Sequence, residues 1–411
     1  MFFIYKILIN LVFFFSPIII IFRIFKGKED VLRFKEKIGF FSKKRNEGKL
    51  IWFHGASVGE IQSIIPLIER FEKNKEIKQI LITSNTVSSS FIIKNLKLKK
   101  TIHQFFPIDC SFISKKFLNY WKPSKVFFID SEIWPITINN LYKRSTPIFL
   151  LNGRITKKSF NRWKVFSSFA KSIFSKFDLC LSSNIETKKY LKKLGAKNIK
   201  IIGNLKFSQS GNEKTNLNKN LVNLINSRKT WCASSTHYNE EKFCAMAHIK
   251  LKKKFKNLLT IIIPRHVNRI NSIKTELNNL NLKVHLDEPQ KKIEPNTDIY
   301  LVNSYGKTKL FYKVCKNIFL GGSLIKHGGQ NPLEATRYGC KVLHGPNVSN
   351  FREIYRFLNK KNLSKKITNQ DQLINYIIKY FNSKNNSKRI IKDLQLIGID
   401  ILNKTYKKIN K

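Results

Sequence analysis

The sequence predicts an α/β protein with two Rossmann-like domains in tandem, an interdomain cleft and an N-terminal hydrophobic anchor helix. Three observations support this prediction. Short apolar runs alternate with amphipathic helical stretches over most of the 411 residues. A polar segment rich in Gly, Ser and Asn, residues 206–220, divides the alternation into two halves. The chain is also long enough for two domains with full cores, at roughly 100–200 residues each.

Residues 1–25 are the candidate membrane segment. Lys6 and Arg23 enclose 16 uncharged, mostly apolar residues, which span about 24 Å as a helix against a hydrocarbon core of ~30 Å. Snorkelling by the two cations compensates for the difference. A signal peptide is the alternative, but no small-residue cleavage site follows. Basic residues crowd the C-terminal flank, so we expect a retained anchor, either spanning the bilayer or lying in its interface, with the body of the protein in the cytoplasm.

Residues 26–208 are expected to form the N-terminal domain. Its near-continuous apolar runs are typical of parallel strands that helices cover on both faces. The runs lie in LIWFHG (50–55), QILITSN (79–85), IHQFFPID (102–109), KVFFIDSE (125–132), PIFLLNGR (147–154), DLCLSSN (178–184) and KIIGNLKF (200–207).

Residues 209–385 are expected to form the C-terminal domain, followed by a helical tail over 386–411. The same alternation restarts here, which predicts a second parallel sheet. Its runs lie in TWCASSTH (230–237), LTIIIPRH (259–266), LKVHLD (282–287), DIYLVNSYG (298–306), IFLGGS (318–323) and KVLHGP (341–346).

The composition limits the classes of partner. There are 77 basic and 26 acidic residues, for a net charge of +51, and such a surface attracts polyanions. The lysines are spread along the whole chain, however, and no zinc-finger, RRM-like or KH-like pattern accompanies them, so nucleic acid is not an expected partner. The six cysteines include no CxxC pair, which fits a reducing cytoplasm and predicts neither disulfides nor a zinc site.

Polar residues and glycines follow the predicted strands in both halves. In open α/β sheets, ligands bind outside the carboxyl ends of the strands. Turns also favour such residues, but their recurrence in both domains favours a site. The clusters are His54-Gly55, Asp130-Ser131-Glu132, Asn152-Gly153-Arg154, Pro264-Arg265-His266 and Gly321-Gly322-Ser323.

The stretch GASVGE, residues 55–60, allows two interpretations of Glu60. Ser57 and Glu60 fit the S-x-x-E capping box, and local evidence favours this helix cap. The other interpretation is a catalytic base at the mouth of a site. Pro66 predicts a kink or restart in the following helix, and an interrupted helix after a small-residue turn is more typical of a site.

A predicted phosphate-binding loop lies in GGSLIKHGGQNPLEATRYG. Two glycine segments let the backbone approach a ligand closely, and a following helix N-terminus offers free N–H groups to a phosphate. An ordinary capped loop is the alternative, but two glycine pairs exceed what capping needs. The predicted loop residues are Gly321, Gly322, Ser323, Gly328 and Gly329.

The helix after this loop is expected to begin at Asn331. Asn331 is a natural N-cap, Pro332 suits the first helical position and Glu334 the third. Glu334 would then accept hydrogen bonds from ribose hydroxyls.

Charged side chains elsewhere complete the candidate site. Arg265 ends a predicted strand, where a guanidinium can bind phosphate with two hydrogen bonds, and Lys206 can neutralise the same group. The alternative for either residue is that it is one of the many surface cations. Asp130 and Glu132 lie two residues apart, on one face if the strand continues. Paired carboxylates suit the stabilisation of positive charge on a sugar ring, although turn acids are common.

Together these motifs resemble the 3-deoxy-D-manno-octulosonic acid (Kdo) transferases of lipopolysaccharide assembly. With the N-terminal anchor, the resemblance covers nearly the whole chain. The matching segments are WFHGASVGE (52–60), DSEIWP (130–135), NGRITKKSF (152–160), GNLKF (203–207), ASSTHYNEE (233–241), PRH (264–266) and GGSLIKHGGQNPLEA (321–335).

The resemblance implies a GT-B fold and an inverting, metal-independent glycosyltransferase. Its donor would be CMP-Kdo and its acceptor a lipid A precursor, lipid IV-A, at the cytoplasmic face of the bacterial inner membrane. No cofactor is expected, and inner-membrane lipids would hold the anchor. The alternatives are another GT-B envelope glycosyltransferase with a different nucleotide sugar, or a non-catalytic membrane-associated polyanion binder.

The resemblance also assigns roles to residues. Glu60 becomes the catalytic base, and Asp130 and Lys206 stabilise the transition state. Asp130 is one methylene shorter than the family's usual Glu, so Glu132 shares or assumes its role. Lys307 stands where an acidic residue is common, and Gln330 replaces a frequent His. The implied nucleotide contacts are Pro264, Arg265, Tyr305, Gly306, Lys307, Asn331, Pro332, Leu333 and Glu334.

Overall fold

The computed structural model describes all residues except 97, 210–215, 289–292, 384–385 and 411. The chain divides into two compact units, one formed by Met1–Gln209 and Ile397–Lys411 and the other by Ser210–Leu396. The sequence placed its domain boundary between residues 208 and 209. Residues 210–215 of the predicted linker lie outside the described residues.

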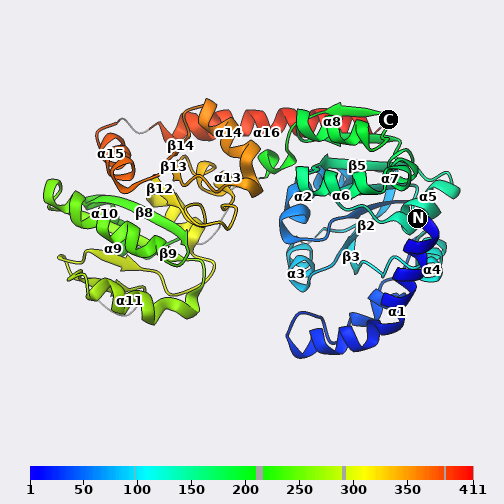
Figure 1. Ribbon diagram of the computed structural model, residues 1–411, viewed down its shortest axis with the longest axis horizontal. Helices are drawn as coiled ribbons and strands as arrows, with labels where there is room; N and C mark the ends of the chain where they lie inside the picture. The colour runs from blue at the N-terminus through cyan, green and yellow to red at the C-terminus, as the bar shows by residue number, and fades with distance from the viewer. Residues whose placement is uncertain (97, 210–215, 289–292, 384–385, 411) are drawn as a thin grey trace. The chain divides into compact units, whose positions relative to one another are not determined.

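The first unit is built on a seven-stranded sheet in the order β3-β2-β1-β4-β5-β6-β7 (Figure 1). Every neighbouring pair is parallel, as the continuous apolar runs predicted. The strands are β1 (Lys49–His54), β2 (Ile77–Ser84), β3 (Thr101–Phe105), β4 (Lys125–Ile129), β5 (Ile148–Gly153), β6 (Leu179–Ser182) and β7 (Ile199–Ile201).

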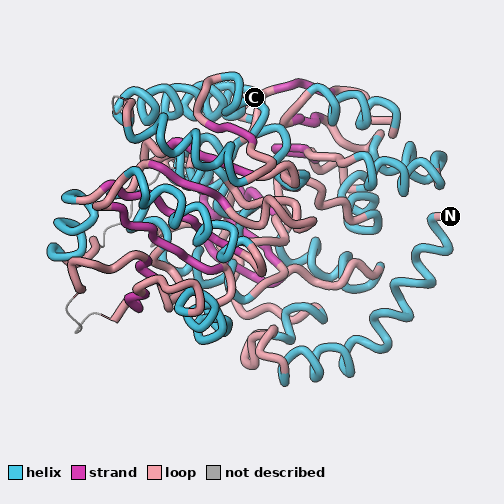
Figure 2. Tube along the Cα trace, turned by 60° about the vertical axis from the view of Figure 1, so that its left-hand side comes forward, coloured by secondary structure: helices cyan, strands magenta, loops and turns pink. Residues whose placement is uncertain are grey.

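Helices cover the strands of this sheet (Figure 2). Trp52, Phe128 and Leu150 from central strands share one core cluster with side chains of α4, α5, α7 and α8, such as Phe117 and Phe174. The helices of the unit are α1 (Phe2–Phe25), α2 (Val58–Glu72), α3 (Val87–Asn95), α4 (Ser111–Trp121), α5 (Pro135–Lys143), α6 (Lys157–Val165), α7 (Ser167–Phe174) and α8 (Ile185–Lys193), with short 3-10 turns η1 (Phe34–Ile38) and η2 (Leu205–Ser208).

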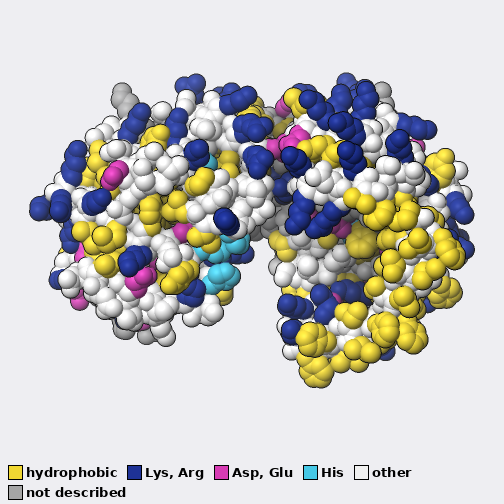
Figure 3. Space-filling view, viewed as in Figure 1, with side chains coloured by type: hydrophobic (Ala, Val, Ile, Leu, Met, Phe, Trp, Pro, Cys, Tyr) yellow, Lys and Arg dark blue, Asp and Glu magenta, His cyan; other side chains and the backbone are white. Residues whose placement is uncertain are grey.

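Helix α1 has the length and composition of a membrane-crossing helix, and hydrophobic side chains gather over this part of the first unit (Figure 3). It runs on as one helix through Pro17. Its first turns are tied to the body of the unit. The Tyr5 hydroxyl donates to Asp109 Oδ2 at 3.0 Å, and the Tyr5 ring packs against Phe169 at 6.0 Å between centroids.

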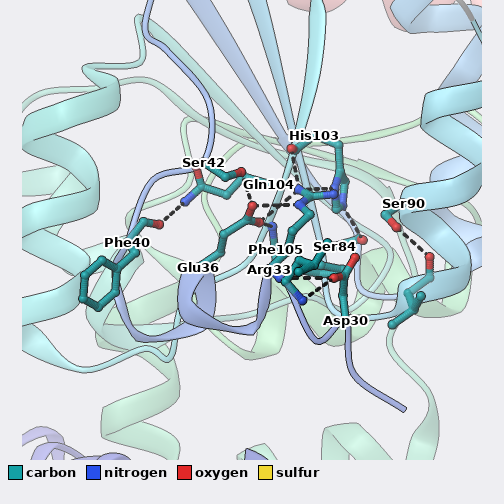
Figure 4. A network of polar contacts seen from close by, with 12 residues as sticks. Asp30, Arg33, Glu36, Phe40, Ser42, Ser84, Ser90, His103, Gln104 and Phe105 are labelled. Carbon is teal, nitrogen blue, oxygen red and sulfur yellow. Dashed lines mark hydrogen bonds and ion pairs between the residues drawn. The ribbon is translucent and has the colours of Figure 1, made fainter. Parts of the chain in front are cut away.

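The segment after α1 is fixed to the β2–β3 edge of the sheet by a polar network (Figure 4). Glu36 is 2% exposed and accepts from Arg33 Nε at 2.8 Å and from the Phe105 backbone N–H at 2.6 Å. Arg33 also donates to the His103 carbonyl at 2.8 Å. His103 Nε2 lies 2.9 Å from Ser84 Oγ. The two ends of α1 are therefore both connected to the first unit.

The second unit contains another seven-stranded parallel sheet, in the order β10-β11-β9-β8-β12-β13-β14. The sequence predicted six of these strands, but not β14, a short polar segment without an apolar run. The strands are β8 (Lys229–Thr236), β9 (Leu258–Pro264), β10 (Val284–Leu286), β11 (Ile299–Leu301), β12 (Asn317–Leu320), β13 (Lys341–His344) and β14 (Ser364–Lys366).

Two core clusters in the second unit contain alternate residues of β8. Trp231 and Ala233 belong to one cluster with α10 and α15, whereas Cys232 belongs to the other with α9 and α12. The helices are α9 (Lys219–Ser227), α10 (Glu240–Lys254), α11 (Ile270–Asn278), α12 (Thr308–Val314), α13 (Pro332–Thr336), α14 (Arg352–Lys360) and α15 (Gln370–Phe381), with 3-10 turns η3 (Val267–Arg269) and η4 (Ser349–Phe351).

The predicted tail, 386–411, contains helix α16 (Ser387–Ile409). The compact units divide this helix, because its last residues from Ile397 belong to the first unit. Gly398 allows α16 to approach the backbone at Phe207 closely, since a Cβ at residue 398 would lie 2.4 Å from the Phe207 carbonyl oxygen.

All six cysteines are buried and free of disulfides. They serve as small apolar side chains in the core.

Candidate functional site

The candidate site of the first unit lies where the strand order changes direction. β1 has β2 on one side and β4 on the other, so crossover connections leave β1 and β4 in opposite directions. Ligands of doubly wound sheets bind at such a switch point. His54 ends β1, and Asp130 follows β4 directly. The sequence prediction that strand ends carry the polar groups is therefore confirmed at this position.

Glu60 is a helix cap in this structure. Ser57 Oγ accepts from the Glu60 N–H, and Glu60 Oε2 accepts from the N–H groups of Ala56 at 2.6 Å and Ser57 at 3.4 Å. This is the predicted capping box. The predicted restart of the helix at Pro66 is wrong, because α2 continues from Val58 to Glu72. Packing of the apolar face of α2 on the sheet outweighs the lost hydrogen bond.

The same carboxylate has the acidity of a general base. Burial, followed by the negative charges of Glu132 and Asp130, raises the pKa of Glu60 to about 7, although hydrogen bonds from Ala56 and Ser57 oppose the shift. A base is most effective when its pKa lies near the operating pH. Capping and proton transfer are therefore compatible in Glu60.

Asp130 is held by partners from two other segments. Lys206 Nζ, from η2, lies 3.6 Å from Asp130 Oδ2. Asn152, from the end of β5, donates to the other carboxylate oxygen and accepts from the Leu205 N–H at 2.9 Å. Asp130 and Asn152 both adopt positive φ angles, 56° and 53°, which Asp and Asn tolerate better than most residues. Asn152 thus connects Asp130 to the turn that carries Lys206.

Glu132 belongs to a second group of side chains. Trp134 Nε1 donates to His54 Nε2 at 2.9 Å and lies 3.1 Å from Glu132 Oε2. His54 Nε2 also lies 3.3 Å from Glu132 Oε2, and His54 Nδ1 lies 2.9 Å from Thr83 Oγ1. Asp130 and Glu132 therefore have different partners, with Lys206 on one and the Trp134–His54 pair beside the other.

The second unit also has a switch point, between β8 and β12. The predicted phosphate loop follows β12 here, but its N–H groups already have an acceptor. Glu240, 1% exposed, accepts from the N–H groups of Gly322 at 2.6 Å, Ser323 at 3.1 Å and Leu324 at 2.9 Å. The Gly321 N–H donates to the Ser234 carbonyl at 2.8 Å.

The prediction that Gly321, Gly322 and Ser323 cradle a phosphate is therefore corrected. The backbone of this segment binds a carboxylate of the chain itself, supplied by α10. The glycines have packing reasons as well, since a Cβ at Gly321 would lie 2.7 Å from Glu240 Oε2.

Gly328 and Gly329 form a tight turn instead of an open cradle. Both have positive φ, 103° and 77°, and a Cβ at Gly328 would lie 2.5 Å from Asn350 Nδ2. The Gly329 N–H donates to the Gly322 carbonyl at 2.9 Å. The two glycines therefore meet conformational and packing requirements of the turn.

The predicted helix start is confirmed. Asn331 Oδ1 accepts from the Leu333 N–H at 3.2 Å, and Pro332 occupies the first position of α13. Pro332 and Leu333 are buried, whereas Glu334 is half-buried.

The remaining predicted nucleotide contacts lie on two strand ends. Pro264 ends β9 and is buried, while Arg265 is exposed. Tyr305 is also exposed and its hydroxyl accepts from the Val267 N–H at 3.3 Å, which joins the two segments. Gly306 follows with a φ of 85°.

Lys307 forms an ion pair at 2.7 Å with Asp287 Oδ2. This pair lines a cavity of about 640 Å³, together with Tyr300 and residues of α9. The ion pair with Asp287 therefore gives Lys307 a local electrostatic role in this chain, at a position where an acidic residue is common.

Sequence reasoning left several residues of these clusters without a role. Asn152 and His54 were noticed only as strand-end polar residues, and Trp134 only as part of a motif. Glu240 and His237 were also missed, although both lie in the ASSTHYNEE segment. The partners of these side chains come from distant parts of the sequence, so no local pattern indicates the contacts.

Within the part of the chain that the structure describes, no group of three or more His, Cys, Asp or Glu residues could hold a metal ion. Metal independence itself stays a prediction.

Comparison with known proteins identifies the family. The model of the 3-deoxy-D-manno-octulosonic-acid transferase (kdotransferase) family matches residues 32–209. A 3-deoxy-D-manno-octulosonic acid transferase of Rickettsia bellii is 32% identical over 88% of this chain and 86% of its own length. The chain belongs to the Kdo transferase family. The family's Haemophilus influenzae member is 30% identical over 79% of this chain and 78% of its own length.

The fold of this Kdo transferase family member also occurs in other sugar-nucleotide enzymes. A putative UDP-N-acetylglucosamine 2-epimerase from Listeria monocytogenes shares it with a TM-score of 0.60, covering 89% of this chain and 97% of its own. At 13% identity, this likeness concerns the fold alone. The GT-B prediction of two parallel-sheet α/β domains is confirmed.

Proposed function

We propose that this chain transfers Kdo from CMP-Kdo to a lipid A precursor of the lipid IV-A type. The reaction belongs to lipopolysaccharide biosynthesis at the cytoplasmic face of the bacterial inner membrane. Membership of the Kdo transferase family supports the reaction class. The observation that carries the site assignment is Glu60, a carboxyl group with a pKa of about 7 beside two further acids.

In the proposed mechanism, Glu60 removes the proton from an acceptor hydroxyl. The hydroxyl oxygen forms a bond to the anomeric carbon of Kdo while the bond from that carbon to the phosphate oxygen breaks. CMP carries away the electron pair of the broken bond, and attack from the opposite face inverts the anomeric centre. A base with a pKa near 7 is half ionised at neutral pH, so it can both accept and release this proton.

We assign stabilisation of the transition-state charge to Asp130, Glu132 and Lys206. The sugar ring gains positive character as CMP departs, and nearby carboxylates stabilise that charge. Lys206 partly neutralises Asp130 at 3.6 Å, whereas Glu132 Oε2 has no lysine among these partners: it accepts from Trp134 Nε1 at 3.1 Å and lies 3.3 Å from His54 Nε2. We therefore assign the larger share of this stabilisation to Glu132, and to Lys206 the orientation of Asp130.

The donor would bind to the second unit, with Arg265 near the phosphate and the 331–334 turn near the ribose. Fixed cationic side chains can balance phosphate charge, and we propose that the reaction needs no divalent metal. Helix α1, with its exposed apolar side chains, would attach the protein to the membrane that contains the acceptor.

The test incubates the full-length protein with CMP-Kdo and a tetra-acylated lipid A precursor in detergent, followed by mass spectrometry. We expect the mass of the acceptor to increase by one or more Kdo units, with release of CMP and without loss of activity in EDTA. UDP-N-acetylglucosamine serves as the control donor. Transfer from the control donor but not from CMP-Kdo would reject the proposal.

A further inference from the structure

Glu240 prevents the glycine-loop backbone from binding the donor's anionic group, so that only side chains can bind it there. Its carboxylate occupies the N–H groups of Gly322, Ser323 and Leu324. A phosphate or carboxylate of a ligand would have to displace a buried carboxylate that accepts these three hydrogen bonds and a fourth from the His237 N–H at 3.0 Å. Such charge-assisted bonds are roughly twice as strong as neutral ones. An anion at this switch point therefore needs side-chain donors.

His237 is a side-chain donor without a partner at the same place. It follows β8 directly, at the switch point beside β12. Its residue is only 6% exposed, yet among the described residues no atom forms a hydrogen bond with the buried Nε2. Burial of an unpaired polar group is unfavourable, and such exceptions in native structures call for an explanation.

Gly322 places no side chain beside this nitrogen. A Cβ at Gly322 would lie 3.1 Å from His237 Nε2 and 3.3 Å from Gln330 Nε2. Two nitrogen atoms from separate segments thus converge on one point, and any side chain at residue 322 would crowd it. The backbone N–H of Gly322 itself is already bound to Glu240.

Histidine and arginine side chains surround the same point. The rings of His327 and His266 lie 4.4 and 5.4 Å from the His237 ring, centroid to centroid, and histidine side chains gather on this face of the second unit (Figure 3). Burial is the largest cause that lowers the pKa of His237 to about 4, followed by the charges of His327, His266 and Arg265. His237 is therefore neutral at pH 7 and can donate one hydrogen bond from Nε2.

We propose that His237 and Gln330 hydrogen-bond the anionic group of the sugar-nucleotide donor, with Arg265 supplying the opposing charge. The ligand group is a phosphate or a sugar carboxylate, both of which accept hydrogen bonds and carry negative charge. The inference rests on the proposed function, because that function supplies a donor with both groups. In this inference, side chains bind the anion in place of the backbone N–H groups of the predicted phosphate loop, and His237 is one of the binding residues.

The experiment measures binding of CMP, cytidine and free Kdo to the full-length protein by calorimetry. The variant His237→Phe keeps a ring of similar size but removes the donor. If the site holds the phosphate, CMP binding weakens by about 10- to 100-fold while cytidine binding is unchanged. If it holds the sugar carboxylate, CMP binding is unchanged and free Kdo shows the loss. Either result supports the inference.

Two further variants keep the test decisive. Gly322→Ala fills the space in front of Nε2 and should produce the same selective loss, even if His237→Phe folds poorly. Lys326→Gln removes an exposed cation of the same loop and should have little effect, which separates a specific site from general electrostatic attraction.

Unchanged binding of CMP and Kdo in both folded variants, His237→Phe and Gly322→Ala, would overturn the inference. Kdo transfer by the unaltered protein, measured in parallel, tests the proposed function separately. Selective loss of anion binding without any Kdo transfer would reject the function but retain the site.

Discussion

Lys206 Nζ lies 3.6 Å from Asp130 Oδ2, although the two residues belong to distant segments of the first unit. Asp130 follows the central strand β4, and Lys206 lies in the short turn η2 near the end of that unit. Asn152 contacts both segments. This contact fixes the cationic turn at the same switch point as Glu60, and it places Lys206 with the acids of the first unit.

Lys206→Met should destabilise the first unit because it leaves a largely buried carboxylate without its cation. Removing one partner of a fully buried pair costs about 3–5 kcal/mol, and we expect roughly 1–3 kcal/mol for this partly exposed pair. Urea unfolding followed by tryptophan fluorescence measures the change. Four tryptophans lie in the first unit, Trp52, Trp121, Trp134 and Trp163. In a double-mutant cycle with Asp130→Asn, a coupling energy of zero would refute the ion pair.

Glu132→Gln should lower the pKa of Glu60. The negative charge of Glu132 is the second cause, after burial, of the raised value of about 7. Since the base must be ionised, log(kcat/KM) rises with pH up to that pKa, and the rising limb should move to lower pH in the variant. The pH profile of Kdo transfer gives the measurement, with the exposed Glu76→Gln as control. A limb that stays in place would contradict the electrostatic coupling.

Asp109 should give the first unit a pH-dependent stability. It accepts hydrogen bonds from the Ile136 and Thr137 N–H groups and from Tyr5, but burial, the largest cause, raises its pKa from 3.8 to about 6. The folded state therefore binds the proton more tightly than the unfolded state. The stabilisation of the folded state by the protonated Asp109 is full below about pH 4 and is lost as the pH rises through about 6.

The measurement for Asp109 compares the free energy of unfolding between pH 4 and pH 7 in the unaltered protein and in Asp109→Asn. Other groups titrate in both proteins, so the difference isolates Asp109. Tyr5→Phe removes a hydrogen bond that lowers the pKa of Asp109 and should move the transition to higher pH. Identical pH dependence in all three proteins would show that Asp109 does not titrate in this range.

Ser57→Ala should cost about 1 kcal/mol of stability, because it removes the side-chain acceptor of the α2 capping box. Glu60→Gln should cost less, since Gln also fits the third helical position of this motif. Thermal and urea unfolding of the two variants provide the comparison. A larger loss in Glu60→Gln than in Ser57→Ala would mean that the negative charge of Glu60 itself stabilises the helix.

Much of the fold was predictable because strands buried on both faces leave continuous apolar runs. Every strand from β1 to β13 coincides with such a run. β14, Ser364–Lys366, was not predicted because this short edge strand contains no apolar residue and therefore shows no hydrophobic pattern. The prediction that the helix restarts at Pro66 was wrong because local helix propensity does not include the packing of the apolar face of α2.

The candidate site was predictable in position but not in its partners. Strand-end residues such as His54 and Asp130 follow from topology, and the Ser57–Glu60 cap follows from local spacing. The contact of Glu240 with the glycine loop depends on how α10 packs beside β12, which no motif encodes. Two glycine pairs therefore suggested an open phosphate cradle where the chain already supplies the carboxylate.

The most direct test of the account is the rate of Kdo transfer by Glu60→Gln, measured beside its affinity for CMP. Gln preserves the cap but cannot accept the proton, so the two roles of Glu60 separate. A general base contributes about 10²- to 10⁴-fold, and we expect kcat to fall by that factor while CMP affinity is unchanged. Transfer at a near wild-type rate by the folded variant would contradict the assignment of Glu60 as the base.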